Sequence, residues 1–206
     1  MPAPKTSRVF LDGVWYENPI FRQVLGICST LAVTNLLKNT LVMVVGLIWA
    51  AAMSNMTFSL LRNVTPRRIR IMVEVLVIST YVILLHLALQ AYLPEISRDL
   101  GPYVGLIITN CILMGRLEAF ASSNPPWPSF VDGVGCGVGY GFILIGIAVI
   151  REMAGFGTLL GIPVLGAWWT RWTLMVMPAG AFFMLGIVVW ACRHIWMIGA
   201  GKEKPA

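Results

Sequence analysis

The 206-residue chain is 58% hydrophobic and only 12% charged, and its formal net charge is +6. A soluble domain carries about a quarter charged residues, so this chain has too few charges to cover a water-facing surface. We expect one integral membrane domain over residues 1–206, without a sizeable soluble domain. The basic residues lie in short gaps between apolar runs, which argues against nucleic-acid binding and indicates that they are topology signals.

The chain opens on a polar segment that includes Lys5, Arg8 and Asp12. This segment contains no short apolar stretch followed by the small residues of a cleavage site, so we expect no cleaved signal peptide. All four cysteines lie within or beside apolar runs, where they are poorly placed for an exported disulfide framework. They are Cys28, Cys111, Cys136 and Cys192.

The first half of the chain holds one short and two long apolar runs. Residues 24–37 are interrupted by Gly26 and are shorter than the about 20 residues that a helix needs to cross the hydrocarbon core. Residues 40–61 and 71–93 are long enough, and arginines crowd around Pro66 in the gap between them. The first run is therefore expected to cross as a broken or half helix, which needs support from protein or a cavity.

The second half repeats this order. Residues 101–115 form a short run that contains a proline, glycines and an asparagine, and long runs follow at 133–150 and 172–192. The proline-rich residues 124–128 are expected to form a connector. Residues 155–169, with their glycines and tryptophans, are expected to form an outer loop near the membrane interface.

These two halves predict an inverted repeat. Each half contributes three crossings, an odd number, so the second half must enter the membrane from the opposite side. We therefore expect an all-α membrane protein of six transmembrane segments, built as two inverted three-helix repeats. The repeats cover about residues 19–93 and 99–196, and the first segment of each is broken.

The lysines and arginines indicate the orientation in the membrane. With the N-terminus in the cytoplasm, 11 of the 15 basic residues lie on the cytoplasmic side. The other side receives only Lys38, Arg98, Arg151 and Arg171. By the positive-inside rule, this distribution predicts that both termini are cytoplasmic.

The two short runs mark the candidate working site. In transport proteins built from inverted repeats, paired interrupted segments at matching positions are the best sequence indicator of that site. Here the pair is residues 25–30 (LGICST) and 107–112 (IITNCI), and each holds one cysteine near its middle. Cys28 and Cys111 either pack as small buried hydrophobes or bind a metal. Tetrahedral zinc or iron takes four ligands, so a metal would need a partner subunit that donates two more.

Four segments closely resemble one family of membrane subunits. This family unites the D subunit of the sodium-translocating NADH:quinone oxidoreductase (Nqr) with the E subunit of the Rnf complex, a ferredoxin:NAD oxidoreductase. The resemblance runs from about residue 18 to residue 190, and the Ser-Phe-x-Asp-Gly stretch is more similar to the Nqr branch. The segments are residues 25–34 (LGICSTLAVT), 104–112 (VGLIITNCI), 114–121 (MGRLEAFA) and 129–135 (SFVDGVG).

The resemblance implies a function for the chain as part of an enzyme. It would be a membrane subunit of a sodium-translocating NADH:quinone oxidoreductase in the bacterial inner membrane, inactive in isolation. It would pair with the E subunit of Nqr, its inverted counterpart, and each would donate two cysteines to one intramembrane [2Fe–2S] centre. The carried-over ligands are Cys28 and Cys111. The centre would relay electrons between flavins on other Nqr subunits, coupled to Na⁺ export, while this chain would hold no flavin, NADH or quinone.

Two alternatives stay open at this point. The chain could be the equivalent E subunit of an Rnf complex. It could also be a redox-inactive membrane scaffold or ion permease, in which Cys28 and Cys111 merely pack. The alternatives differ in whether function requires the two thiolates.

Three residues depart from the family pattern. Cys136 stands where asparagine is expected and Cys192 matches no known ligand, so we interpret both as packing residues. His86 stands in the third span where relatives often carry a carboxylate. Because hard cations prefer oxygen ligands, we assign no sodium coordination to His86.

Other charged residues near the membrane have structural interpretations. Glu74 is expected to form an i, i+4 ion pair with Arg70, and Arg116 is expected to pair with Glu118 at the cytoplasmic edge. Asp132 is either the N-cap of the fifth span or a carboxylate of an ion pathway, and the resemblance favours the pathway. The glycines that follow it predict close helix packing.

Overall fold

A computed structural model of the chain describes residues 10, 25–92, 101, 103–159, 162–163 and 177–200. This part of the chain is helical, apart from the antiparallel pair of strands β1 (Thr158–Leu159) and β2 (Ile162–Pro163). The helices are α2 (Ile27–Val33), α3 (Leu37–Leu61), the 3₁₀ turn η2 (Arg67–Ile69), α4 (Arg70–Tyr92), α6 (Cys111–Arg116), the π-helical turn η3 (Leu117–Ala121), α7 (Pro126–Phe156) and α9 (Pro178–Ala200).

Several of these helices are built to cross a membrane. In the described part of the chain, α3, α4, α7 and the stretch Tyr103–Ala121 are long and apolar enough to span it, and Ala179–Ala191 in α9 is a shorter apolar helix. The protein is therefore an all-α membrane protein with several spans, as predicted. Residues 19, 93 and 99, at the expected ends of the repeats, lie outside the described residues.

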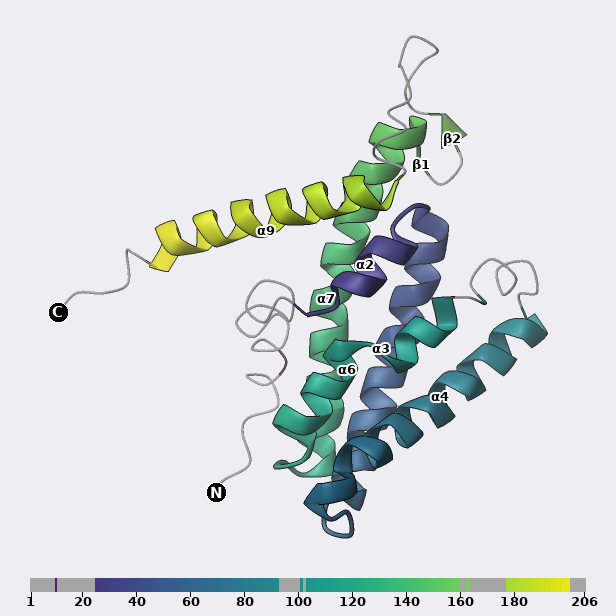
Figure 1. The fold of residues 1–206 in the computed structure, drawn as a ribbon, viewed down its shortest axis with the longest axis vertical. Helices are drawn as coiled ribbons and strands as arrows, with labels where there is room; N and C mark the ends of the chain where they lie inside the picture. Colours follow the sequence, from purple (N-terminus) through teal and green to yellow (C-terminus); the bar gives the residue numbers. More distant parts are fainter. Residues whose placement is uncertain are drawn as a thin grey trace, which may run out of the picture.

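The two halves of the chain pack as inverted counterparts around the central antiparallel pair formed by α3 and α7 (Figure 1). α4 follows α3 at the lower end of this pair, and α9 begins at the upper end and extends to the other side (Figure 1). Each outer helix also contacts the half helix of the other repeat, α4 with α6 and α9 with α2. This crosswise exchange is what an inverted repeat predicts.

Three glycines on one face of α7 let it approach α3 closely. A Cβ at Gly133 would lie 2.8 Å from the Ala51 carbonyl oxygen, and one at Gly137 would lie 3.0 Å from the Ile48 side chain. A Cβ at Gly141 would collide with Val44. Residues four apart lie on the same side of a helix, so these small residues form the stripe predicted to allow close packing in a membrane.

The second short segment is broken, as predicted, but the break lies later than its proline suggests. In the first segment, the half helix α2 begins after Gly26 and ends at Val33, and α3 begins at Leu37. In the second, the helix is interrupted at Thr109 and Asn110 and resumes at Cys111. Asn110 has an extended backbone and its side chain caps the new helix, which is the conformation of an N-cap residue.

α7 is longer than the expected residues 133–150 at both ends. Its first turn contains two prolines, which are tolerated there because the first N–H groups of a helix have no intrahelical partner. The predicted connector at 124–128 is correspondingly shorter, and Asp132 lies inside the helix, so its interpretation as the N-cap was wrong. Gly157 ends the helix in a left-handed conformation with φ 69°.

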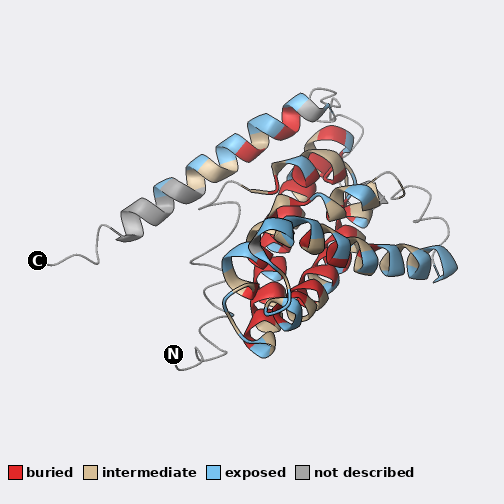
Figure 2. Ribbon diagram, turned by 60° about the horizontal axis from the view of Figure 1, so that its bottom comes forward, coloured by how far each residue is buried: buried red, intermediate tan, exposed pale blue. Residues whose placement is uncertain are grey.

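The buried residues lie mainly along α3 and α7, while α4 is largely exposed (Figure 2). The exposed face of α4 carries large apolar side chains such as Leu76 and Ile83, and α9 exposes Phe183 and Trp190. In a membrane protein such faces contact lipid or the apolar surface of other subunits.

We predict that Gly133→Ala weakens the packing of α7 on α3. The added methyl group would collide with backbone at Ala51, so the free energy of unfolding should fall by roughly 1–3 kcal/mol, as in other overpacked cores. The matched control is Gly146→Ala in the same helix, because no atom lies within 4 Å of a Cβ there. The apparent melting temperature of the detergent-purified protein measures the effect, and an equal change in both variants would contradict the close approach.

Candidate metal centre

The N-terminal ends of the two half helices meet. The Gly26 N–H, just before α2, donates a hydrogen bond to Cys111 Sγ, the first residue of α6, with a nitrogen–sulfur distance of 3.0 Å. Cys28 is the second residue of α2. The structure therefore joins the two segments that the sequence analysis paired, 85 positions apart in the chain.

Only glycine suits position 26. Its φ of 81° lies in the left-handed region, which residues with a Cβ rarely adopt. A Cβ would also collide with the side chain of Ile112 and lie 2.9 Å from Tyr140 Cε2. The interrupted sequence of the first segment thus permits both the turn and the approach to Cys111.

Asn110 connects the two half helices through its side-chain amide. Its Oδ1 accepts a hydrogen bond from the Ile112 N–H at 3.0 Å and so caps α6. Its Nδ2 donates to Ser29 Oγ on α2, also at 3.0 Å. A single residue therefore sets the start of one half helix and ties it to the other.

Tyr140 supports this junction from α7. The side chain is 0% exposed, and its hydroxyl donates to the Gly26 carbonyl oxygen at 2.8 Å. The same hydroxyl lies 3.1 Å from Ser29 Oγ. Because hydroxyl groups both donate and accept, Asn110, Ser29, Tyr140 and Gly26 form a continuous hydrogen-bonded chain beside Cys111.

The two predicted cysteines differ in accessibility. Cys28 is exposed on the chain by itself and Cys111 is partly buried, and both are free thiols. Among the described residues, no group of three or more His, Cys, Asp or Glu side chains is arranged to hold a metal ion. Of these two thiols, Cys28 is accessible from outside the chain and Cys111 only in part.

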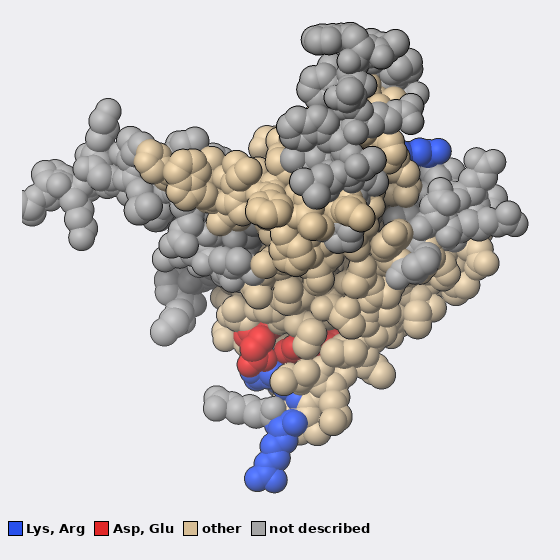
Figure 3. Space-filling view, turned by 45° about the horizontal axis from the view of Figure 1, so that its top comes forward, with Lys and Arg blue, Asp and Glu red and all other residues tan. Residues whose placement is uncertain are grey.

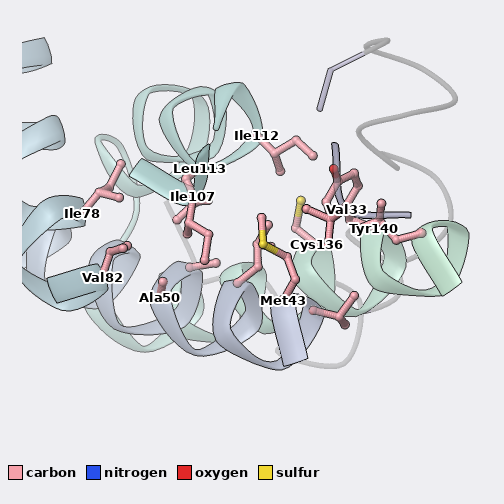
Figure 4. Packing of buried hydrophobic residues seen from close by; sticks show 14 of the residues in the cluster. Val33, Met43, Ala50, Ile78, Val82, Ile107, Ile112, Leu113, Cys136 and Tyr140 are labelled. Atoms are coloured by element: carbon pink, nitrogen blue, oxygen red, sulfur yellow. The ribbon is translucent and has the colours of Figure 1, made fainter. Parts of the chain in front are cut away.

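The third described cysteine has a different environment. Cys136 is 1% exposed and belongs to the hydrophobic core, where Figure 4 shows it near Tyr140 and Met43. This burial confirms the interpretation of Cys136 as a packing residue. The side chain of Cys192 lies outside the described residues.

Asp132 forms a buried ion pair with Arg116. The sequence had predicted Glu118 as the partner of Arg116. Arg116 Nε donates to Asp132 Oδ2 at 3.0 Å, and a second contact joins Nη2 to Oδ1. The predicted Arg116–Glu118 pair was wrong because Glu118 instead accepts from Arg70, on α4. The role of Asp132 in an ion pathway stays a prediction, and its carboxylate is already engaged in this pair.

The predicted pair of Glu74 with Arg70 was also wrong. Arg70 Nη1 lies 3.0 Å from Glu118 Oε1, whereas Glu74 Oε1 has no hydrogen-bond partner in the described part of the chain. His86, also on α4, is partly buried, and its Nδ1 likewise has no partner among the described residues.

Arg151 and Glu152 hold the connection between α2 and α3, a role that the sequence did not predict. Glu152 Oε2 accepts from the Leu37 N–H at 2.8 Å, which caps α3 where Leu36 has no capping side chain. Arg151 Nη1 donates to Thr34 Oγ1 at 2.5 Å. Arg151 was expected in the loop after residue 150 and instead lies buried inside α7. Two adjacent charged residues at the end of an apolar run could have indicated this role, because ionisable residues inside a membrane usually have a specific partner.

The fold is that of a multi-span membrane protein, and one of its free cysteines, Cys28, is exposed. The chain matches the family described as "Rnf-Nqr subunit, membrane protein" over residues 6–189, and it belongs to this family.

Among known proteins, the chain is similar to subunits of one complex. It is 47% identical over 191 residues to the D subunit of the Na(+)-translocating NADH-quinone reductase of Photobacterium profundum, covering 90% of this chain and 89% of that protein. It is 44% identical over 196 residues to the subunit of the same name from Shewanella sp. (strain ANA-3), covering 93% of each. For Shewanella putrefaciens (strain CN-32 / ATCC BAA-453) the identity is 43%, with 93% of each covered. The resemblance stated from the sequence is confirmed.

We predict that Glu152→Ala destabilises the protein more than Glu152→Gln. Alanine leaves the buried Leu37 N–H without an acceptor, which costs roughly 1–3 kcal/mol, whereas the glutamine side chain retains an oxygen that can accept. The apparent melting temperature of the purified assembly should fall in the order wild type, Gln, Ala. Equal loss in both variants would show that the carboxylate charge, rather than the hydrogen bond, stabilises the connection between α2 and α3.

Proposed function

We propose that the chain is the D-type membrane subunit of a Na⁺-translocating NADH:quinone oxidoreductase, and that it holds half of an iron–sulfur centre. In this proposal Cys28 and Cys111 supply two thiolates of a [2Fe–2S] centre, and the E subunit of the complex supplies the other two. The observation that carries the proposal is the junction of the two half helices, where the Gly26 N–H lies 3.0 Å from Cys111 Sγ.

The residues at this junction fit such a centre. Thiolates are the ligands of biological iron–sulfur clusters, which take four of them. Cys28 lies on the half helix whose preceding residue, Gly26, bonds to Cys111, and it is exposed on the chain by itself. Among the described residues, no group of three or more metal-binding side chains is found. A bound [2Fe–2S] centre supplies one-electron transfer, here between flavins on other subunits. A half-site of two thiols needs a second subunit to complete it.

The residues around the thiols fix their positions. The N–H group of Gly26 stabilises negative charge on Cys111 Sγ, and hydrogen bonds to sulfur help to set the reduction potential of such centres. Tyr140 holds the Gly26 peptide from the carbonyl side, and Asn110 fixes the start of α6. In this proposal each half helix supplies one thiolate from its first turn, and the hydrogen bonds of Gly26, Tyr140 and Asn110 support the junction beside Cys111.

The other parts of the proposal follow from the same assignment. The complex lies in the bacterial inner membrane with both termini of this chain in the cytoplasm, which fits the arginines in the turn between α3 and α4. Its partners are the E subunit, the remaining Nqr subunits, lipid and Na⁺, and the flavins, NADH and quinone bind elsewhere. Similarity to proteins named as the D subunit of the Na(+)-translocating reductase favours this complex over Rnf.

We predict that Cys28→Ser and Cys111→Ser each remove the iron–sulfur centre from an assembled complex. Serine lacks the thiolate that iron requires. Iron and acid-labile sulfide should fall by the amount of one [2Fe–2S] centre per complex, with loss of its EPR signal in the reduced enzyme. The matched control is Cys136→Ser, a change in a core cysteine. Iron retained in both ligand variants would support the redox-inactive scaffold or permease instead.

We predict that Tyr140→Phe changes the potential of the centre without removing iron. The ring stays in place, but the hydrogen bond to the Gly26 carbonyl oxygen is lost, so the Gly26 N–H is held less firmly towards Cys111. A weaker hydrogen bond to sulfur stabilises the reduced centre less, so its midpoint potential should become more negative. An EPR-monitored redox titration measures this shift, and an unchanged potential would exclude Tyr140 as a positioning residue.

A further inference from the structure

The turn that joins α3 to α4 carries a concentration of positive charge. Residues 62–70 contain four arginines and no acidic residue. Arg62 is the C-cap of α3, and Arg68 lies in the 3₁₀ turn η2, where its side chain is exposed. Figure 3 shows charged side chains gathered at the lower end of a face that is otherwise nearly uncharged in its described part. We call residues 62–70 the arginine turn.

Nearby carboxyl groups do not neutralise the arginine turn. Among the described residues, neither Arg62 nor Arg68 forms an ion pair or a side-chain hydrogen bond. Arg70 differs, because its Nη1 lies 3.0 Å from Glu118 Oε1. Glu74 shares a hydrogen bond with Glu118, which requires one proton between the two carboxyl groups. Glu74, Glu118 and Arg70 together are therefore neutral, and the charges of Arg62 and Arg68 remain uncompensated.

Large apolar side chains lie exposed around these arginines. Val64, in the turn itself, is 83% exposed, and Met72, in the first turn of α4, is 75% exposed. Ile71 lines an open groove between α4 and α6, together with Met114 and Gly115. Exposing such side chains to water is unfavourable. The arginine turn therefore borders the hydrocarbon of the membrane instead of lying free in water.

Trp127 indicates the same depth in the membrane. Ser59 Oγ, near the end of α3, donates to the Asn124 carbonyl oxygen just before α7, so the end of α3 and the start of α7 lie side by side. Trp127, in the first turn of α7, is 64% exposed. Tryptophan is enriched where the membrane meets water, so the adjoining arginine turn lies at the level of the lipid head groups.

We propose that the arginine turn binds an anionic phospholipid, with Arg62 and Arg68 on its phosphate and its acyl chains along the exposed first turns of α4. Basic clusters beside the end of a transmembrane helix attract anionic lipids, and guanidinium groups bind phosphate through paired hydrogen bonds. A zwitterionic lipid carries its own positive charge and fits two uncompensated guanidinium groups less well. A free anion would leave the apolar side chains uncovered. This site does not depend on the iron–sulfur centre.

The test is binding of phosphatidylglycerol to the delipidated, assembled complex, measured by native mass spectrometry for wild type, Arg62→Gln, Arg68→Gln and the double variant. Each arginine near an anionic lipid surface changes binding by roughly fivefold. We therefore expect roughly fivefold weaker binding in each single variant and roughly twentyfold weaker binding in the double variant. The matched control is Lys38→Gln, an exposed basic residue at the opposite end of α3, which should leave binding unchanged. Unchanged binding in the double variant would overturn the proposal.

The lipid is tested on the wild-type complex by photolabelling, which needs no variant and so stays decisive if a substituted complex does not assemble. A phosphatidylglycerol with a photoreactive acyl chain should label Ile71 and Met72 on α4 far more than the exposed Phe183 on α9. Unlabelled phosphatidylglycerol should displace it, whereas phosphatidylcholine and inorganic phosphate should not. Equal labelling of α4 and α9, or equal displacement by phosphatidylcholine, would show unselective lipid contact and overturn the site. Displacement by inorganic phosphate would show an anion site without lipid and would overturn it as well.

Discussion

The junction of the two half helices at Gly26 and Cys111 is the constraint on which the candidate centre depends. A helix broken inside a membrane leaves backbone groups without intrahelical partners, and in lipid these groups must find partners in the protein. Here the Gly26 N–H donates a hydrogen bond to the sulfur of Cys111, and the Gly26 carbonyl oxygen accepts one from the Tyr140 hydroxyl. The same contacts thus give the exposed backbone groups of Gly26 their hydrogen-bond partners and hold the proposed ligand Cys111 in position.

The close packing of α3 on α7 makes this junction possible. Tyr140 lies between Gly137 and Gly141 on α7, so the helix that carries it is held against α3 by the glycine stripe. The two ends of α7 each carry a buried charged group that fixes a neighbouring segment, Asp132 with Arg116 near one end and Glu152 with Leu37 near the other. One helix therefore supports the Gly26–Cys111 junction, the end of α6 and the connection between α2 and α3.

Apolar run lengths and helix-breaking residues predicted the helices and the two short segments that meet at Gly26 and Cys111, because these depend on local sequence and on membrane thickness. The charge pairs were predicted between residues close together in the sequence, and they were wrong, because the ion pairs of Arg70 and Arg116 join different helices. Arg70 bonds to Glu118 across 48 residues, and Arg116 bonds to Asp132 across 16. Such pairings depend on the tertiary packing angle of each helix, which hydropathy does not encode. The capping of α3 by Glu152, which lies 115 residues from Leu37 in the chain, could not be predicted for the same reason.

The most direct test of the central claim leaves both cysteines in place and changes only the junction, through Gly26→Ala in the assembled complex. If the approach of the two half helices builds the centre, the variant should lose the iron–sulfur EPR signal and its iron, because alanine disfavours φ near 81° and collides with Ile112. Subunit composition, checked on the same preparation, should stay unchanged. An intact complex with full iron content and an unaltered EPR spectrum would contradict the account.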